Sequence, residues 1–506
     1  MSDAHLTHDT AAQGDRTSGP TSARLVIPSV AVLMLLAALD QTIVSTALPT
    51  IVADLGGLEH LSWVVTAYIL ASTVVAPLYG KVGDLFGRRN VVIFAVVIFL
   101  IGSALCGVAT NMPFLIGARA LQGLGGGGLF VLALSIIGDV IPPRERGRVQ
   151  GLFAGVFGVA SVAGPLLGGW FVDAFSWHWI FYINLPFGIL ALLGFTFGFH
   201  KQTERVSHKI DYAGAVALTL ALSSIVILTA LGGVEFGWTD PIALGIVALF
   251  FASLIAFALI EQRAQEPIIP LSLFKNNVFT VTSLVSFVTG AVMFGSLTFI
   301  PVFLQLAKGQ SATVSGLQLI PMTLGMLIAS TGSGRYMTAT GRYRRLPIFG
   351  LGFVSVAVLT LTQLTADLPS AVLWGALLLL GLGMGSTIPV MTTAVQNAVK
   401  RTQIGTATAA GLMFRQVGGS IAVALFGALF AARFAALMGT SGIEVGNVSE
   451  LGPKAISGLS GAVQSEIATN VAVALHPIYA IATALAVTGF IIACFMREIP
   501  LQTRES

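Results

Sequence analysis

Apolar runs of membrane-spanning length recur along most of this chain of 506 residues. A helix needs about 20 mostly apolar residues to cross a hydrocarbon core, and in lipid every backbone N–H and C=O must be bonded internally. Only 9% of the residues are charged, against roughly a quarter in soluble domains. We predict an all-α polytopic membrane protein with fourteen transmembrane helices, at residues 25–50, 61–80, 90–110, 113–139, 147–172, 178–199, 211–232, 241–261, 278–304, 312–334, 346–364, 370–398, 404–434 and 472–496.

The basic residues indicate the orientation of these spans, because Lys and Arg collect in short cytoplasmic loops. With both termini cytoplasmic, only Lys308, Arg433 and Lys454 fall outside, and Arg119 and Arg415 lie within spans, which leaves 21 of the 26 basic residues inside. We therefore predict a multi-pass protein of a bacterial inner membrane with both termini in the cytoplasm.

The loop after the second predicted span has a degraded copy after the tenth. The first copy runs from Gly80 to Arg89, and the second runs from Gly334 to Arg344. A repeat offset of eight helices on one side of the membrane indicates two parallel six-helix halves with two extra helices between them. We predict a disordered cytoplasmic tail (1–24), an N-terminal six-helix bundle (25–203), a two-helix insert (204–266) and a C-terminal six-helix bundle (267–506) with an outer loop at 435–471.

Six short runs are specific enough to compare with known motifs: Leu39–Pro49, Gly80–Arg89, Leu115–Gly125, Gly164–Gly169, Trp179–Pro186 and Phe414–Gly419. Together they resemble the major facilitator superfamily over the whole chain, in particular its fourteen-helix drug:proton antiporter branch. Leu39–Pro49 resembles the first-helix motif of that branch, and Gly80–Arg89 resembles the superfamily's signature loop. Leu115–Gly125 resembles the helix-four motif that is tied to proton coupling. This resemblance implies two six-helix bundles plus two inserted helices.

Asp40 is the acidic residue that lies near the middle of a predicted span. A carboxylate there costs about 2.5–3.5 kcal/mol on insertion scales, so it should face a cavity, find a partner or be protonated. One carboxylate that binds either a proton or a cation meets the minimum requirement for exchange, and the alternative is a hydrogen bond between helices. For Arg119, the resemblance implies a role in proton coupling, and the alternative is a tether to backbone carbonyls or to Gln122.

The repeated loops suit a conformational latch. In the first copy the glycines allow a tight turn, Asp84 can accept from a helix N-terminus, and Arg88 can bridge Asp84 to Asp139. Thr338 replaces the acid in the second copy, so we expect a weaker latch there; the alternative is a basic loop that only sets orientation. The candidate latch residues are Gly80, Gly83, Asp84, Gly87, Arg88, Arg89, Asp139, Gly334, Gly341 and Arg342.

The fifth predicted span is rich in glycine around a proline, which permits close helix approach and a bend. The resemblance connects this run with antiport, although Ala160 stands where the family pattern usually has glycine; generic packing is the alternative. The motif residues are Gly151, Gly164, Pro165, Gly168 and Gly169. Three polar side chains within spans are candidates for the substrate path, namely Gln122, Asn184 and Arg415, and Arg415 serves either packing or an anionic group on the substrate.

The function that these features predict is proton-coupled export of amphipathic small molecules, such as drugs and lipophilic cations. The sequence has no Gly-x-x-x-x-Gly-Lys-Ser/Thr motif, so we expect the proton gradient, and no cofactor or metal, to supply the energy. Export of a lipid, siderophore or secondary metabolite is the alternative. A membrane enzyme or sensor is remote, since clustered catalytic residues at one depth are lacking. The expected partners are the substrate, protons and the bilayer, with no nucleic acid, and the expected state is a monomer.

Overall fold

The computed structural model describes residues 23–56, 60–199, 211–233, 235–441 and 460–501. Within these ranges the chain is helical apart from its connections and one isolated bridge between Gly232 and Phe236. In chain order the elements are α1 (Ala23–Leu55), α2 (Leu61–Phe86), α3 (Arg88–Gly107), α4 (Met112–Val140), α5 (Pro143–Ala174), α6 (Trp179–Tyr182), α7 (Asn184–Gly198), α8 (Tyr212–Leu231), α9 (Pro241–Glu261), η2 (Leu271–Lys275), α10 (Asn277–Val302), η3 (Phe303–Ala307), α11 (Ala312–Leu317), α12 (Ile320–Thr340), α13 (Arg345–Leu361), α14 (Ser370–Ala398), η4 (Arg401–Gln403), α15 (Ile404–Ser441) and α17 (Gly461–Cys494).

Twelve candidate membrane helices are long and apolar enough to cross a bilayer within the described part of the chain. Each of them overlaps one predicted span. The two other predicted spans correspond to α5, which has 32 residues and carries charges in its first turns, and to α13, an apolar helix of 17 residues. The prediction of an all-helical membrane protein is therefore confirmed at the level of twelve candidate spans.

The outer surface of the helices is apolar, which is the reverse of a soluble bundle. Leu190, Phe197 and Phe495 are 66%, 72% and 70% exposed. A soluble protein rarely leaves so many large apolar side chains uncovered, whereas lipid tails cover them at no cost. A few helices begin with a capping side chain, as α4 does at Asn111, which accepts a hydrogen bond from the Phe114 amide at 2.9 Å.

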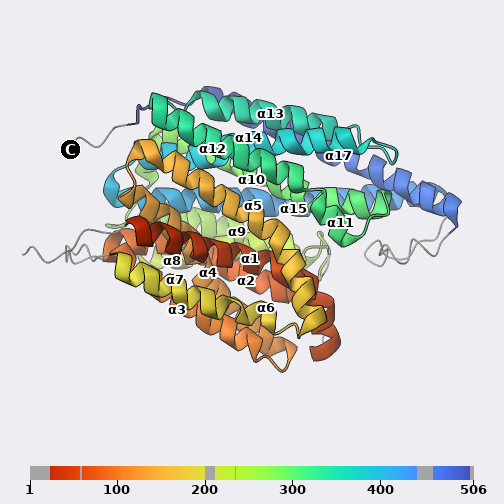
Figure 1. Cartoon of the computed structure of the whole chain (residues 1–506), viewed down its shortest axis with the longest axis horizontal. Coiled ribbons are helices and arrows are strands. Elements are labelled where there is room, and N and C mark those ends of the chain that lie inside the picture. Colours follow the sequence, from red (N-terminus) through yellow and green to blue (C-terminus); the bar gives the residue numbers. More distant parts are fainter. Residues whose placement is uncertain (1–22, 57–59, 200–210, 234, 442–459, 502–506) are drawn as a thin grey trace, which may run out of the picture.

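The same pattern of helix packing occurs twice. In the first half α1 packs against α5, and α2 and α3 pack against α4; in the second half α10 packs against α15, and α12 and α13 pack against α14. Figure 1 shows the red-to-yellow helices and the green-to-blue helices as two groups. The groups meet along α2 with α15 and along α5 with α12, so these two pairs form the interface between the bundles.

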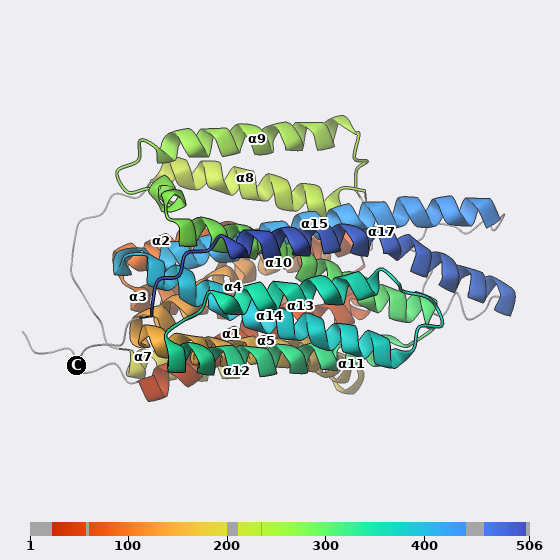
Figure 2. The same ribbon diagram turned by 90° about the horizontal axis from the view of Figure 1, so that it is seen from above.

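Helices α8 and α9 form a separate pair beside this interface (Figure 2). They pack against each other, and α8 also contacts α2 and α15, one helix from each bundle. The α8–α9 pair therefore lies against the interface between the two bundles.

Two predicted boundaries differ from the structure. The predicted outer loop 435–471 is helical at both ends, because α15 continues to Ser441 and α17 begins at Gly461, and residues 442–459 lie outside the described residues. The alanines after Phe430 favour a helix in water as well as in lipid, so loss of apolar character does not end α15. Of the predicted tail, residues 1–22 also lie outside the described part of the chain.

Candidate functional site

A buried ion pair joins α1 to α4 inside the first bundle. Arg119 Nη1 lies 2.6 Å from Asp40 Oδ2, and the two residues are 1% and 0% exposed. A charge at this depth is stable only with a partner, and each residue is the partner of the other. The structure therefore brings together the two residues that the sequence singled out for proton coupling.

Three further polar side chains complete the cluster: Gln122 from α4, Ser103 from α3 and Asn184 from α7. Gln122 donates to Asp40 at 2.7 Å and to Ser103 of α3 at 2.6 Å, and it accepts from Arg119 at 2.6 Å. Asn184, at the start of α7, donates to Asp40 at 3.3 Å and to Ser103 at 3.1 Å. We call Asp40, Ser103, Arg119, Gln122 and Asn184 the coupling cluster. It ties α1, α3, α4 and α7 together, so a change in the charge of Asp40 affects four helices.

Helix α2 supplies further contacts of Arg119, in addition to the Phe181 ring of α6, whose centre lies 5.7 Å from the guanidinium. Arg119 Nε donates to the Val64 carbonyl at 3.1 Å, and its guanidinium lies 4.3 Å from the centre of the Tyr68 ring. A cation over an aromatic face is stabilised by the ring quadrupole, more strongly when water is excluded. These contacts add to the ion pair with Asp40 in fixing the position of the Arg119 guanidinium.

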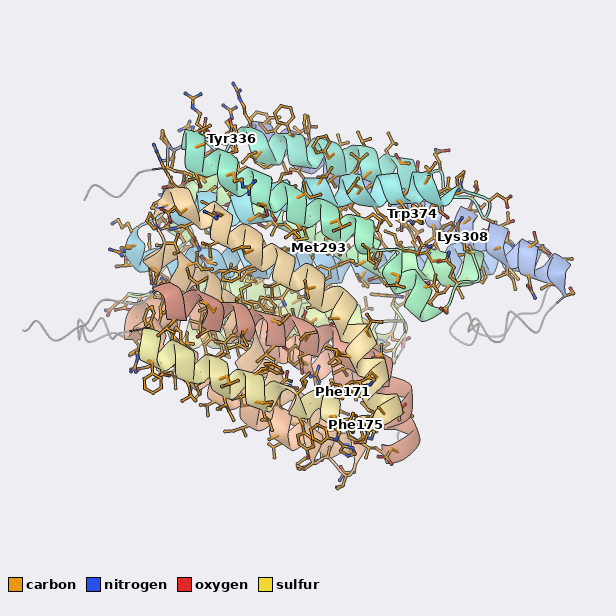
Figure 3. All side chains as sticks on the ribbon, viewed as in Figure 1. Phe171, Phe175, Met293, Lys308, Tyr336 and Trp374 are labelled. Carbon is orange, nitrogen blue, oxygen red and sulfur yellow. The ribbon has the colours of Figure 1, made fainter. Side chains whose placement is uncertain are left out.

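A cavity of about 130 Å³ lies between the two bundles, near the middle of the molecule, where Met293 is labelled in Figure 3. Its wall is mostly apolar with a few amides and one guanidinium. The first bundle contributes Met34, Gln41, Phe130, Gln150 and Phe153, and the second contributes Met293, Met326, Thr392, Arg415 and Gln416. Such a wall suits an amphipathic guest.

The three candidates for the substrate path are not at one place. Arg415 lines the cavity. Gln122 and Asn184 are 0% and 1% exposed within the coupling cluster and do not line the described cavity. Gln41 is the link between the two sites, because it lines the cavity and directly follows Asp40 on α1.

The first latch loop closes one end of the interface between the bundles. Asp84, at the end of α2, accepts from the backbone N–H groups of Gly405 at 2.9 Å and Thr406 at 2.8 Å, in the first turn of α15. The N-terminus of a helix carries unpaired donors and a partial positive charge, so it binds a carboxylate well. We call this the latch end of the molecule.

Arg88 connects the latch within the first bundle. Its guanidinium lies 2.9 Å from Asp84 Oδ1 and 2.6 Å from Asp139 Oδ2 of α4. The turn before it needs Gly87, whose φ of 84° is unfavourable for other residues. The geometry is the one predicted for the loop, with Arg88 bridging two carboxylates and Asp84 capping a helix of the other bundle.

The glycines of the first loop act through packing. A Cβ on Gly80 would lie 2.5 Å from the Ala409 Cβ and 2.7 Å from the Gly405 carbonyl, so Gly80 lets α2 approach α15 closely. A Cβ on Gly83 would lie 3.0 Å from the Leu132 side chain of α4. Arg89 donates to the Thr196 carbonyl of α7 at 3.2 Å and so binds its own bundle.

Across the interface between the bundles, the second loop makes a neutral hydrogen bond where the first makes a charged one. Thr338 donates to the Arg144 carbonyl of α5 at 2.9 Å, and Gly334 lies so close to α5 that a Cβ would be 2.6 Å from the Arg148 Cα. Gly341 ends α12 with a φ of 68°, and Arg342 is exposed. The Tyr343 hydroxyl accepts a hydrogen bond from the Ile499 amide, so this loop is bound to the C-terminal segment of its own bundle. Burial of the Tyr343 side chain raises its pKa.

The glycines of α5 serve two interfaces. Gly164 and Gly168 pack against α1 at Thr42, Ile43 and Thr46, just beyond Asp40. Gly151 faces α12 in the other bundle, where Ser330 donates to its carbonyl at 3.2 Å. No described atom lies within 4 Å of a Cβ on Gly169, and the side chain of Pro165 is outside the described residues.

Gly164→Ala is expected to destabilise the protein by about 1–3 kcal/mol, because the new methyl group overlaps the Thr42 hydroxyl and forces α1 away from α5. Gly169→Ala is the matched control, since its methyl group enters open space and alanine favours a helix by about 0.5–1 kcal/mol over glycine. The melting temperatures of the two variants in detergent test this. Equal melting temperatures would contradict the assigned packing.

Several residues of the site were not predicted from the sequence. Ser103, Gln41, Gly405 and Thr406 take part through tertiary contacts. The signal for Ser103 was available, since it is a polar residue in an apolar run. Nothing in the local sequence of Gly405 and Thr406 marks them as partners of a residue more than 300 positions away.

Comparison with known proteins agrees with this architecture. Residues 30–423 match the model of the Major Facilitator Superfamily. The chain is 38% identical over 486 residues to the uncharacterized MFS-type transporter Rv1877 of Mycobacterium tuberculosis, which covers 95% of this chain and 70% of that protein. It is 39% identical over 409 residues to the multidrug transporter protein MdtP of Bacillus subtilis, covering 81% and 75%.

The fold agrees with solved structures of low sequence identity. The human organic anion transporter MFSD10 superposes with a TM-score of 0.64 at 16% identity, over 93% of this chain and 99% of that one. At this identity the likeness shows the fold alone. The family match and the level of identity to the relatives establish membership: the chain is a multi-pass membrane protein that belongs to the Major Facilitator Superfamily.

Proposed function

We propose that this protein is a proton-coupled antiporter that exports amphipathic small molecules across a bacterial inner membrane by alternating access. It crosses the membrane fourteen times, with α5 and α13 joining the twelve helices of sufficient length and apolarity, and it has both termini in the cytoplasm. The relative named as a multidrug transporter favours efflux of drug-like compounds. The protein works as a monomer and without a cofactor, using the proton gradient as its energy source.

The observation that carries this proposal is the Asp40–Arg119 pair beside the central cavity. Arg119 has further partners in Val64, Tyr68 and Gln122, so protonation of Asp40 removes one of its contacts and leaves the arginine in place. Neutralising Asp40 therefore weakens the tie between α1 and α4 without breaking the cluster.

A chain of contacts connects Asp40 with the interface between the bundles. Helix α1 carries Gln41 into the cavity and packs on α5 at Gly164 and Gly168. Helix α5 in turn packs along α12 of the second bundle. Substrate at Gln41 and a proton at Asp40 thus act on the same helix, which is the physical requirement for exchanging one for the other.

The latch gives the transport cycle two states. In the structure the latch end is closed by Asp84 on the N-terminus of α15 and by Thr338 on α5. With the latch end on the cytoplasmic side, this state receives protons from outside and releases substrate there. Opening of the latch then exposes the cavity to the cytoplasm.

Proton movement driven by substrate tests the proposal directly. The purified protein is reconstituted into vesicles with its latch end outward and an acidic lumen, and compounds are added from a panel of lipophilic cations, anions and neutral amphipaths. We expect active compounds to enter the vesicles and to raise the pH of the lumen, whereas vesicles without protein show neither effect. Uptake of a compound with no change in lumenal pH would establish a facilitator and contradict proton coupling.

A further inference from the structure

Arg415 is a charged residue of the cavity wall that lacks a partner. It lies on α15 in the second bundle, half-buried, and among the described residues its guanidinium has no hydrogen bond and no ion pair. Arg119, the other arginine at this depth, is held by a carboxylate, an amide, a carbonyl and an aromatic ring. The difference between Arg415 and Arg119 is informative, because a cation at this depth needs a partner.

The backbone of Arg415 is firmly positioned. A Cβ on Gly290 of α10 would overlap the Arg415 carbonyl, so α10 and α15 are in direct contact at this level. The guanidinium is therefore presented to the cavity by a rigid helix pair. It also borders a smaller pocket that is lined by the hydroxyls of Thr282, Ser286, Thr289 and Thr408.

The surroundings of Arg415 offer no counter-charge. None of the described residues that line the cavity is an aspartate or a glutamate. Asp40, the acid of the coupling cluster, is already paired with Arg119. A cationic guest would meet an uncompensated positive charge in a medium of low dielectric constant, whereas an anionic guest would supply the missing partner.

We propose that Arg415 binds the anionic group of amphipathic substrates, such as a carboxylate or a sulfonate, and that the apolar part of the substrate lies among Phe130, Phe153 and Met293. This inference rests on the proposed export function and narrows its substrate class from amphipathic small molecules in general to amphipathic anions. Arg415 forms the charged contact, and Gln416 and Thr392 add further polar side chains to the wall of the same cavity.

Binding of three ligands with one ring system and different charge tests this inference. The probes are 2-naphthoate, 2-naphthamide and (2-naphthylmethyl)trimethylammonium, and their affinities for the purified full chain in detergent are measured at pH 7.5 by equilibrium dialysis. We expect the wild type to bind naphthoate about 10-fold or more tightly than naphthamide, as one charge-assisted contact provides, and the ammonium compound most weakly. Binding needs no gradient, so this result is independent of whether proton-coupled transport occurs.

Three variants assign the preference to the residue. Arg415→Gln is expected to remove the preference for naphthoate, and Arg415→Lys to keep most of it. Arg433→Gln, at an exposed position of the same helix, is the control and should bind like the wild type. Naphthoate preference that persists in Arg415→Gln, or a wild type that prefers the ammonium compound, would overturn the inference.

Thermal stability separates recognition from a structural role. An arginine that supports the fold is expected to lower the melting temperature when it is replaced. An arginine held without a partner is expected to leave the melting temperature of Arg415→Gln unchanged or raise it, because the substitution removes an uncompensated charge. A clear fall in melting temperature, with probe binding of Arg415→Gln unchanged in its charge preference, would assign Arg415 to packing instead.

Discussion

Asp40→Asn abolishes proton release from reconstituted vesicles when substrate is added, while substrate binding persists. Asparagine keeps the shape of the side chain and its contact with Gln122, but it cannot take up and release a proton. We expect the signal in the vesicle assay to fall to the level of vesicles without protein. This is one of the two largest effects that we predict, because Asp40 is the residue on which the coupling depends.

The stability of Asp40→Asn must be measured beside its transport. The substitution leaves Arg119 buried without a counter-ion, which costs about 3–5 kcal/mol when a buried pair is broken. Asp40→Asn with Arg119→Gln removes both charges and is expected to regain most of that stability, yet to remain uncoupled. A double variant that is stable and silent assigns the loss to coupling, whereas proton release by Asp40→Asn would move the proton site to another residue.

Asp84→Asn is expected to open the latch end. The carboxylate accepts from two backbone N–H groups of α15 and pairs with Arg88, and asparagine retains only part of these contacts. Loss of about 3 kcal/mol from the closed state corresponds to a roughly 100-fold change in the ratio of closed to open molecules. Distances between spin labels at Asn90 and Thr402, on the two sides of the latch, measure the shift after Cys106 and Cys494 have been replaced.

Thr338→Val is the control for the second loop. It removes one neutral hydrogen bond to the Arg144 carbonyl, which is worth about 1 kcal/mol, so we expect a much smaller population of the open state than in Asp84→Asn. Equal effects of the two substitutions would contradict the view that the charged latch dominates. An unchanged distance distribution in Asp84→Asn would show that other contacts at the interface hold this end closed.

Local sequence patterns were sufficient to predict those features of the fold that depend on a single physical cause acting along the chain. Apolar runs located the helices because lipid requires each span to bury its own backbone hydrogen bonds. The geometry of the latch was also predictable, since the sequence places an acid, a tight turn and an arginine within a few residues of one another. The partner of Asp84 was predicted only by type, as a helix N-terminus, because its identity depends on how the two bundles meet.

Boundaries and exposure were less predictable. Helices α15 and α17 continue beyond the predicted spans, and in α15 the alanines after Phe430 favour a helix in water as well as in lipid. Gln122 and Asn184 were grouped with Arg415 on the substrate path because all three are polar residues in apolar runs. The structure places the first two in the coupling cluster and only the third in the cavity wall.

The sequence by itself determined that this chain is a helical membrane protein, that its halves repeat, and that Asp40 and Arg119 are charges in need of partners. Only the tertiary structure decided which of the charges within the spans are paired. Asp40 and Arg119 satisfy each other, whereas Arg415 faces the cavity without a partner among the described residues. The reason is that the cost of a buried charge depends on what surrounds it in three dimensions, and contacts between distant helices cannot be read from the composition of any one of them.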